Sequence, residues 1–496
     1  MSKPLKIVSI SSEVDPYSKS GGLADVARSL PRALKRLKHK IIVITPLYSQ
    51  VTDIKKYELK KIFSDVKLAV SQDVFMEANF WQGELMKGLP IYFVENNKYF
   101  GKNKNIYGSQ HENARFFFFD VAVIELIKLL NFEPDIIHCH DWHTGLIPYF
   151  LKGRYKSDPI FTRTATIYTI HNLTFQLGQN WWEIPSNLKD DGRTPLPKFE
   201  HSPAVERINF AKRAIMKVDL INAVSENYAK EILTKDFGED LNIILKNRKE
   251  KLFGIVNGID YNDYNPLTDP GLKQNYGPQT VSDKFKNKEY LQKYFELPLR
   301  REVPILGMAT RITEQKGFDL LMKIFDDLMT LDIQFVIMGS GDKAYEKFFV
   351  DMKKKYPEKV GHHLEFDTKN ASLIYAGSDI FLMPSRFEPC GLGQLISLRY
   401  GCIPVVRATG GLVDTITDFN PNTGKGNGFV FHKYDSKAFL IACTRAIETF
   451  RHESVWSKLI QNGFRESFSW RIPAKKYVLL YRKAIKNKLL SNNHTA

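Results

Sequence analysis

Three charged side chains in the second half of the chain have the types and positions of a ligand-binding site. Arg311 and Lys316, in the segment ATRITEQKGFDLL, follow a strand-like run and precede a helix-like one. Glu388, in MPSRFEPCGLGQ, occupies a similar junction. A guanidinium offers phosphate oxygens a planar fork, and an ammonium offers them a point charge. Together the three groups predict a ligand site at the carboxyl ends of parallel strands.

The pattern Gly-Gly-Leu-x-Asp occurs twice, at Gly21–Asp25 and at Gly410–Asp414. A glycine pair before a helix lets the backbone approach a phosphate, and the helix N-terminus then offers N–H donors. Two domains that face each other would each contribute such a turn, so the two copies predict two walls of one site. Turns also need glycine for conformational reasons, and each pair fits an ordinary turn equally well.

These side chains need a scaffold of parallel strands, and the sequence predicts two such scaffolds. Short β-branched runs alternate with helix-period segments, which is typical of a doubly wound α/β fold. The strands predicted in the first half are KIVSI (6–10), KIIVITP (40–46), IYFVE (91–95), DIIHCH (135–140), ATIYTI (165–170) and DLINAVS (219–225). The pattern restarts at residue 303 with VPILGMAT, IQFVIMG, HHLEF, DIFLMPS, IPVVRAT and GFVF. We expect two Rossmann-like domains joined by a linker over 257–280, which is rich in Gly, Pro, Asn and Asp.

Length and composition predict a soluble protein of two domains. The chain has 496 residues, 43% of them hydrophobic, and single cores stop growing near about 250–300 residues. No charge-free apolar run reaches the about 18 residues of a membrane span, and no targeting segment is evident. The four cysteines have neither metal-site nor disulfide spacing, which favours a reducing compartment and hence the cytoplasm.

The formal charge of +16 suggests a nucleic-acid partner. The lysines, however, are spread through nearly every helix-like segment, and the one compact cluster is DMKKKYPEK at 351–359. The sequence has no zinc-ligand spacing, RNP-type aromatic motif or basic zipper. We therefore expect a generally basic solvated surface, with no nucleic-acid partner and no membrane partner.

Nine segments between residue 5 and about residue 485 resemble, in order, the motifs of the bacterial glycogen synthase and plant starch synthase family. They are KSGGLADV, HCHDWHTGL, TIHNLTFQ, VNGIDYNDYNP, TRITEQKGFDL, GSGD, MPSRFEPCGLGQ, ATGGLVDT and FSW. The resemblance implies two facing Rossmann-like domains of the GT-B type, with an interdomain cleft and a C-terminal helix that crosses back to the first domain. The expected divisions are a glucan-acceptor domain over 1–256, a nucleotide-sugar domain over 257–475, and a returning helix and tail over 476–496.

The resemblance also implies an activity. The family transfers glucose from a nucleotide sugar, usually ADP-glucose, to the non-reducing end of an α-1,4-glucan such as glycogen or a maltooligosaccharide, with retention at the anomeric carbon. The expected enzyme is a glycosyltransferase without cofactor or metal, because Arg311 and Lys316 would stabilise the leaving diphosphate. The alternatives are a UDP-glucose-dependent enzyme, a retaining transferase of the same fold with another acceptor, and a non-catalytic basic binding protein.

The family roles on the first domain fall on the KSGGLADV and HCHDWHTGL segments. By resemblance, Lys19 would bind the nucleotide sugar, Gly21 and Gly22 would lie near the diphosphate, and Asp25 would brace their turn. Within HCHDWH, His138 is expected to face the core, while His140 and His143 compete for contact with the transferred glucose. We expect His140 to make that contact.

On the second domain, the resemblance assigns the leaving diphosphate to Arg311 and Lys316 and the sugar ring to Glu388. Leu392 and Gly393 would lie over the ribose and phosphate.

Three positions depart from the family pattern on the nucleotide side. Phe366 stands where relatives usually place a tyrosine stacked on adenine, so stacking is kept and the phenol hydroxyl is lost. Gly393 replaces a hydroxyl or amide side chain, and Ile396 replaces a tyrosine. These changes leave the choice between ADP-glucose and UDP-glucose open, although Phe366 would stack more extensively on a purine.

Two aromatic runs lie outside the motifs assigned to chemistry. The four phenylalanines at 116–119 are expected in the core of a helix. The pair Trp181–Trp182 is interpreted as packing, with a glucan platform as the alternative.

Overall fold

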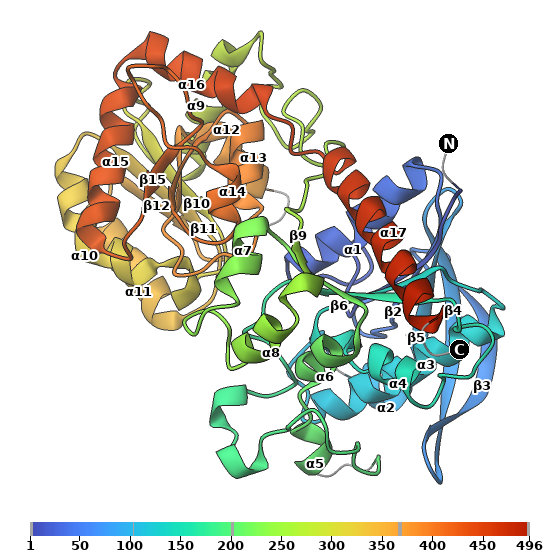
Figure 1. Cartoon of the computed structure of the whole chain (residues 1–496). Coiled ribbons are helices and arrows are strands. Elements are labelled where there is room, and N and C mark those ends of the chain that lie inside the picture. Colours follow the sequence, from blue (N-terminus) through green and yellow to red (C-terminus); the bar gives the residue numbers. More distant parts are fainter. Residues whose placement is uncertain (1–2, 103, 200–202, 366–369, 494–496) are drawn as a thin grey trace. The chain divides into compact units, whose positions relative to one another are not determined.

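The computed structural model describes residues 3–102, 104–199, 203–365 and 370–493 (Figure 1). The chain forms two compact units. Unit 1 comprises Met1–Ile255 together with Trp470–Ala496, and unit 2 comprises Val256–Ser469. The first unit therefore contains both ends of the chain.

Unit 1 is built on a nine-stranded sheet with the order β3-β4-β5-β2-β1-β6-β7-β8-β9. Neighbouring strands are parallel from β5 to β9, whereas β3 and β4 form an antiparallel extension at one edge. The central strands are rich in β-branched residues that are buried on both faces, as a covered parallel sheet requires. The strands are β1 (Lys6–Ile10), β2 (Lys40–Pro46), β3 (Lys60–Ser71), β4 (Val74–Met86), β5 (Leu89–Glu95), β6 (Ile136–His140), β7 (Ala165–Ile170), β8 (Leu220–Ala223) and β9 (Leu252–Gly254).

Helices cover the sheet of unit 1, and α3 is its most buried helix. The four phenylalanines Phe116–Phe119 of α3 are each at most 2% exposed, which confirms their expected place in a helix core. Neither α3 nor any other helix in the described ranges is long and apolar enough to cross a membrane. The helices of unit 1 are α1 (Gly22–Arg36), α2 (Asn97–Phe100), α3 (Glu112–Leu129), α4 (Ile147–Lys152), α5 (Pro203–Glu206), α6 (Phe210–Lys217), α7 (Glu226–Glu231), α8 (Asn242–Asn247) and α17 (Arg471–Asn493).

The C-terminal helix α17 packs against α1 and β7 of unit 1, which confirms the expected return of the last helix to the first domain (Figure 1). Two tyrosines on its inner face are fully buried. Tyr477 Oη accepts from Asn222 Nδ2 at 2.9 Å, and Tyr481 Oη lies 2.9 Å from His138 Nδ1. The helix is therefore attached to the strand ends by apolar packing and by buried hydrogen bonds.

Unit 2 contains a six-stranded sheet with the order β12-β11-β10-β13-β14-β15, in which every pair is parallel. One hydrophobic core lies on each face of the sheet. The strands are β10 (Ile305–Ala309), β11 (Gln334–Met338), β12 (Val360–His363), β13 (Ile380–Met383), β14 (Ile403–Arg407) and β15 (Phe429–Phe431). The helices are α9 (Lys284–Tyr294), α10 (Phe318–Thr330), α11 (Lys343–Lys355), α12 (Ala371–Gly377), α13 (Gly393–Arg399), α14 (Gly411–Thr415), α15 (Ser436–Phe450) and α16 (Glu453–Arg465).

The segment 257–280, expected as a linker, packs within unit 2. Tyr276 is 1% exposed, and its hydroxyl donates to the carbonyl of Tyr400 at 2.7 Å. The backbone N–H of Ile259 donates to the carbonyl of Phe468 at 2.8 Å. The chain thus enters and leaves unit 2 along neighbouring segments.

Candidate active site

The candidate residues of unit 1 lie at the carboxyl ends of two neighbouring strands. β1 and β6 are parallel and adjacent, with Ile10 opposite Cys139. The loop after β1 carries Lys19 and leads into α1, while His140 is the last residue of β6. In doubly wound sheets this edge is where ligands bind.

The glycine loop of unit 1 holds its lysine beside an aspartate. Lys19 Nζ lies 2.5 Å from Oδ1 of Asp25, in the first turn of α1. Burial raises the pKa of the Asp25 carboxyl, and the charge of Lys19 acts in the opposite direction. Gly21 precedes α1 in an extended conformation, and a Cβ added there would meet no atom within 4 Å. The space beside Gly21 is therefore open to a ligand.

A buried glutamate, Glu13, is hydrogen-bonded to the backbone of this loop. The Glu13 carboxylate is 2% exposed and accepts the backbone N–H of Ser20. Burial raises its pKa to about 8, whereas hydrogen bonds from the Ser20 and Gly21 N–H groups act to lower it. Glu13 thus fixes the backbone of the glycine pair. Sequence analysis missed this residue, because nothing in its local pattern shows that it bonds to a loop seven residues later.

His140 is completely buried, and both of its ring nitrogens have neighbours. Nδ1 lies 2.9 Å from Nε2 of His171, and Nε2 lies 3.4 Å from Oγ of Ser9. Burial lowers the pKa of His140 to about 3, so its imidazole is neutral at physiological pH. His171, which follows β7, thereby orients His140, and sequence analysis did not single it out.

The other two histidines of HCHDWH have different surroundings. His138 is buried between Tyr481 and Thr169, with its two nitrogens 2.9 and 2.7 Å from their hydroxyl groups. It faces the core, as expected. His143 stacks against Tyr107 and Trp142, at centroid distances of 4.9 and 4.1 Å.

Asp141 links the ends of β6 and β7. Its carboxylate accepts the backbone N–H of His171 at 2.7 Å, and burial raises its pKa to about 7. Asp141 has a φ of 58°, a conformation that costs a non-glycine residue about 1–3 kcal/mol. Strained backbone of this kind is common at functional sites. Here the conformation of Asp141 turns the chain directly after His140.

In unit 2, a lysine and a glutamate from two different loops form an ion pair. Lys316 Nζ lies 2.7 Å from Oε2 of Glu388, and their side chains are 16% and 8% exposed. The hydroxyl of Ser385 also donates to Oε2 of Glu388, at 3.0 Å. The sequence-predicted carboxylate and cation are therefore brought together at the carboxyl ends of β10 and β13.

Backbone contacts hold these two loops of unit 2 together. The N–H of Arg386 donates to the carbonyl of Gln315 at 2.8 Å, and Gln315 Nε2 donates to the carbonyl of Phe387 at 3.2 Å. Gly317 has a φ of 77°, and a Cβ added there would lie 2.0 Å from the carbonyl oxygen of Pro384. Only glycine allows this approach.

The second glycine pair has a packing role. Gly410 has a φ of 46°, and a Cβ added there would lie 1.9 Å from the carbonyl oxygen of Glu388. The N–H of Gly411 donates to the same oxygen at 3.0 Å. The second copy of Gly-Gly-Leu-x-Asp thus supports the backbone that carries Glu388, whereas the first copy leaves open space.

The remaining sequence-predicted residues of unit 2 lie near this ion pair in the chain. Arg311 is exposed, two residues beyond the end of β10. Leu392 precedes α13 and Gly393 begins it, and a Cβ added at Gly393 would lie 3.0 Å from the ring of Phe381. Gly393 departs from the family pattern at a position where the ring of Phe381 leaves little room for a side chain. Ile396 is 5% exposed and belongs to the core. Phe366 lies outside the described residues.

Comparisons with known proteins agree with this arrangement. A family described as "Starch synthase catalytic domain" matches residues 6–247, and one described as "Glycosyl transferases group 1" matches residues 292–461. The chain is 45% identical to the glycogen synthase of Moorella thermoacetica over 494 residues, covering 98% of each chain. It is 44% identical to the glycogen synthase of Desulforudis audaxviator over 495 residues, covering 97% of each.

Solved structures agree with the family match. The catalytic domain of starch synthase IV from Arabidopsis thaliana, bound to ADP and acarbose, matches with a TM-score of 0.86 and 32% identity, over 98% of this chain and 100% of that one. Sucrose-phosphate synthase from Thermosynechococcus elongatus shares the fold, with a TM-score of 0.63 at 15% identity. The chain therefore belongs to the glycogen synthase and starch synthase family and is a glycosyltransferase.

Proposed function

We propose that this enzyme transfers glucose from ADP-glucose to the non-reducing end of an α-1,4-glucan, with retention at the anomeric carbon. The 2.7 Å contact between Lys316 Nζ and Glu388 Oε2 carries the proposal. It places a cation suited to a leaving diphosphate beside a carboxylate suited to sugar hydroxyls. Cleavage of a glycosyl–phosphate bond needs a cation at the phosphate end and a hydrogen-bond acceptor at the sugar end.

The charge that develops during transfer matches the groups of unit 2. Breaking the bond between C1 and the diphosphate oxygen builds negative charge on the diphosphate and positive charge on the sugar. In the proposal, Arg311 and Lys316 stabilise the diphosphate, Glu388 accepts hydrogen bonds from the glucose hydroxyls, and Leu392 and Gly393 lie over the ribose and phosphate.

The groups of unit 1 serve the donor and the acceptor. Lys19, with Asp25 as its partner, binds the nucleotide sugar, and the open space at Gly21, next to Gly22, admits its diphosphate. His140, held neutral by burial, contacts the transferred glucose. The acceptor O4 attacks C1 as the diphosphate leaves on the same face, and a diphosphate oxygen takes the O4 proton. No protein nucleophile is required.

The matched proteins and one aromatic residue of the sequence support ADP-glucose and a glucan. The matched starch synthase IV catalytic domain was solved with ADP and acarbose, and the curated relatives are glycogen synthases. In the proposal, Phe366 stands where relatives usually have a tyrosine stacked on adenine, and its aromatic face would stack more extensively on a purine than on a pyrimidine. Cys139, Cys402 and Cys443 are buried thiols in the structure, which supports a reducing compartment, and we propose the cytoplasm.

The decisive experiment offers labelled ADP-glucose and UDP-glucose separately, each with glycogen and with maltooligosaccharides. We expect incorporation into both glucans, with higher kcat/KM for ADP-glucose. Equal or faster turnover of UDP-glucose would overturn the donor assignment. Incorporation into neither glucan would overturn the acceptor assignment.

We also propose that transfer is independent of a metal, because Arg311 and Lys316 supply the positive charge that a divalent ion would otherwise bring. Turnover after dialysis against EDTA should equal turnover with added magnesium. Activity that disappears on chelation and returns with metal would show that these two cations do not neutralise the diphosphate alone.

A further inference from the structure

The neighbouring residues Trp181 and Trp182 have different environments, one in a core and the other at the surface. Trp181 is 3% exposed and packs with Leu177 and Ile184 in a small core within the segment between β7 and α5. Trp182 has 58% of its surface exposed. The packing interpretation of this pair therefore holds for Trp181 and is wrong for Trp182, whose ring lies at the surface.

Polar contacts hold the exposed indole of Trp182 in one orientation. Its Nε1 donates to Oε2 of Glu239 at 2.7 Å. The ammonium of Lys189 lies 4.9 Å from the ring centroid of Trp182 and 4.5 Å from that of Trp181, within the range of cation–π attraction. Trp182 is thus a fixed apolar plane with charged groups beside it.

The glutamate that holds Trp182 lies in an unusual turn. Glu239 and Asp240 have φ values of 47° and 68°, a conformation that non-glycine residues rarely adopt. Both carboxylates accept a hydrogen bond from an indole N–H: Trp181 Nε1 donates to Oδ2 of Asp240 at 3.2 Å, and Trp182 Nε1 donates to Oε2 of Glu239. The turn therefore directs two carboxylates at two neighbouring tryptophans.

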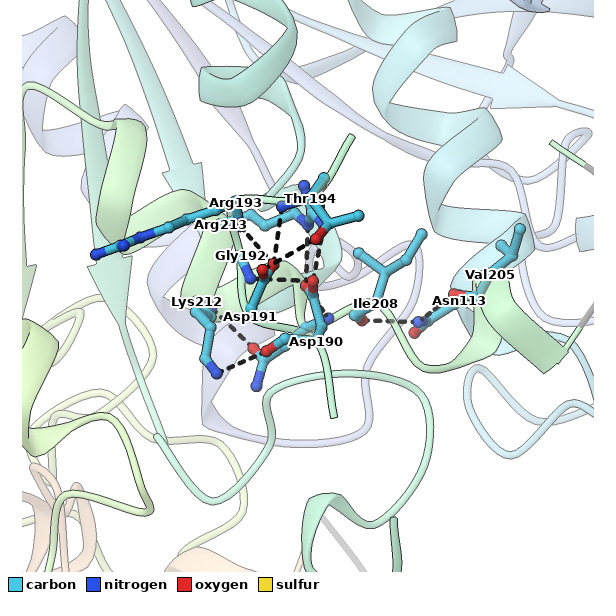
Figure 2. Close-up of polar contacts among 11 residues, drawn as sticks. Asn113, Asp190, Asp191, Gly192, Arg193, Thr194, Val205, Ile208, Lys212 and Arg213 are labelled. Carbon is cyan, nitrogen blue, oxygen red and sulfur yellow. Dashed lines mark hydrogen bonds and ion pairs between the residues drawn. The ribbon is translucent and has the colours of Figure 1, made fainter. Parts of the chain in front are cut away.

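The loop that carries Trp182 is anchored to α6 by a buried ion pair (Figure 2). Asp190 accepts from Nε and Nη2 of Arg213 at 2.9 and 2.7 Å, a two-point contact with the Arg213 side chain 2% exposed. Asp191 accepts the backbone N–H groups of Arg193 and Thr194 at 2.7 and 2.8 Å. Figure 2 shows these groups converging on the two aspartates. The Asp190–Arg213 contact therefore attaches the segment that carries Trp182 to α6.

The polar surroundings of Trp182 suit a sugar. Asn180, Glu183 and Asp240 are exposed, and each offers amide or carboxylate groups for hydroxyls. A pyranose has an apolar C–H face and a rim of hydroxyl groups, so a fixed indole bordered by such groups matches both.

We propose that Trp182 is the stacking platform of a second glucan-binding site, with Glu239 as the residue that positions the indole. The proposal rests on the proposed α-1,4-glucan acceptor. The loop leaves the carboxyl end of β7, and β7 is paired with β6, which ends in His140. A glucan held by Trp182 would stay bound to unit 1, the unit that carries His140, where tethering raises the local concentration of its chain ends.

The test compares the full-length enzyme with its Trp182→Ala variant in native gels containing glycogen and in transfer assays. We expect Trp182→Ala to lose most of the glycogen retardation and to raise the half-saturating glycogen concentration by about fivefold or more. The kcat, and the KM for maltotriose, should stay unchanged, because a short acceptor cannot occupy both sites. Phe75→Ala is the matched control, since Phe75 is 56% exposed and has Lys67 Nζ 4.7 Å from its ring.

A second variant separates loss of the platform from misfolding. Trp182→Phe keeps an aromatic face without the N–H that binds Glu239, so it should retain more glycogen retardation than Trp182→Ala. Unchanged retardation and unchanged glycogen kinetics in Trp182→Ala would overturn the site, as would an equal loss in Phe75→Ala. Failure of all transfer from ADP-glucose, with retardation still dependent on Trp182, would instead overturn the proposed function alone.

Discussion

Each lysine assigned to the donor already has a carboxylate partner in the structure. Lys19 is paired with Asp25, and Lys316 with Glu388. Such pairs hold flexible lysine side chains in place before a ligand arrives, which reduces the entropy lost on binding. The motifs predicted the residue types, whereas the pairing across loops is visible only in the fold.

Replacement of Lys316 by Ala should lower kcat by about 10²–10³, the usual effect of removing one preorganised charge from a transition state, and Arg311→Ala should do the same. Lys316→Arg should not restore full activity, because a planar guanidinium cannot take the place of a compact ammonium. Steady-state kinetics with saturating donor and glycogen measure both effects.

The control for this series is Lys343→Ala, because the Lys343 side chain is 90% exposed and also pairs with a glutamate, Glu346. It should retain the activity of the parent enzyme. A Lys316→Ala variant that folds and turns over at the parent rate would remove Lys316 from the diphosphate site.

Glu13 makes the stability of unit 1 depend on pH. Burial raises its pKa in the folded state to about 8, above its ordinary value of 4.5. Between these two values the folded state binds more protons than the unfolded state, so stability falls as the pH rises and levels off above about pH 8. Glu13→Gln removes this dependence, so its melting temperature relative to the parent should increase between pH 6 and pH 8.5. A difference that stays constant or decreases over this range would show that the carboxyl does not titrate in that window.

At the level of elements, the buried parallel strands were predicted well and the exposed edge was not. The strands starting at Lys6, Lys40, Ile305 and Gln334 match apolar runs that the sequence shows directly. β3 and β4 were missed because they form an edge extension with many exposed polar residues and three register shifts. The strand expected from HHLEF begins earlier, at Val360, because Val360 and Gly361 pair with β11.

Parts of the candidate site were also beyond sequence analysis. Glu13 and His171 act through partners on separate loops, and no local spacing identifies such contacts. Trp182 shares its residue type with the neighbouring Trp181, and only the fold separates the exposed ring from the buried one. The segment 257–280 has the composition of a linker, yet Tyr276 packs it within unit 2.

The attachment of α17 can be tested through one hydroxyl. Tyr481→Phe leaves the ring in the core but removes the partner of His138 Nδ1. An unsatisfied buried polar atom costs about 1–3 kcal/mol, so the free energy of unfolding should fall by that amount in denaturant titration. Leu479→Ala, on the same helix, is the control: Leu479 is 70% exposed, and its loss should change stability by less than about 0.5 kcal/mol. Equal effects of the two substitutions would show that the Tyr481 hydroxyl does not contribute.

At the level of the whole molecule, the proposed functional residues are divided between the two units. Lys19 and His140 belong to unit 1, and Arg311, Lys316 and Glu388 belong to unit 2. If all of them act on one donor, bound ligands must restrict how the two units move relative to each other.

Small-angle scattering should therefore show a smaller radius of gyration when ADP and a maltooligosaccharide are both saturating than with either ligand alone. In the proposed function, ADP would bind to Arg311 and Lys316 on unit 2 and the oligosaccharide would bind to unit 1 near His140, so we expect the two ligands together to favour closure. Lys316→Ala should need more ADP to reach the same compaction, which ties the change to the diphosphate. Trp182→Ala should compact normally with a short oligosaccharide, because its proposed site lies outside the transfer site. An unchanged radius in the parent enzyme under both ligands would mean that transfer does not require the two units to close.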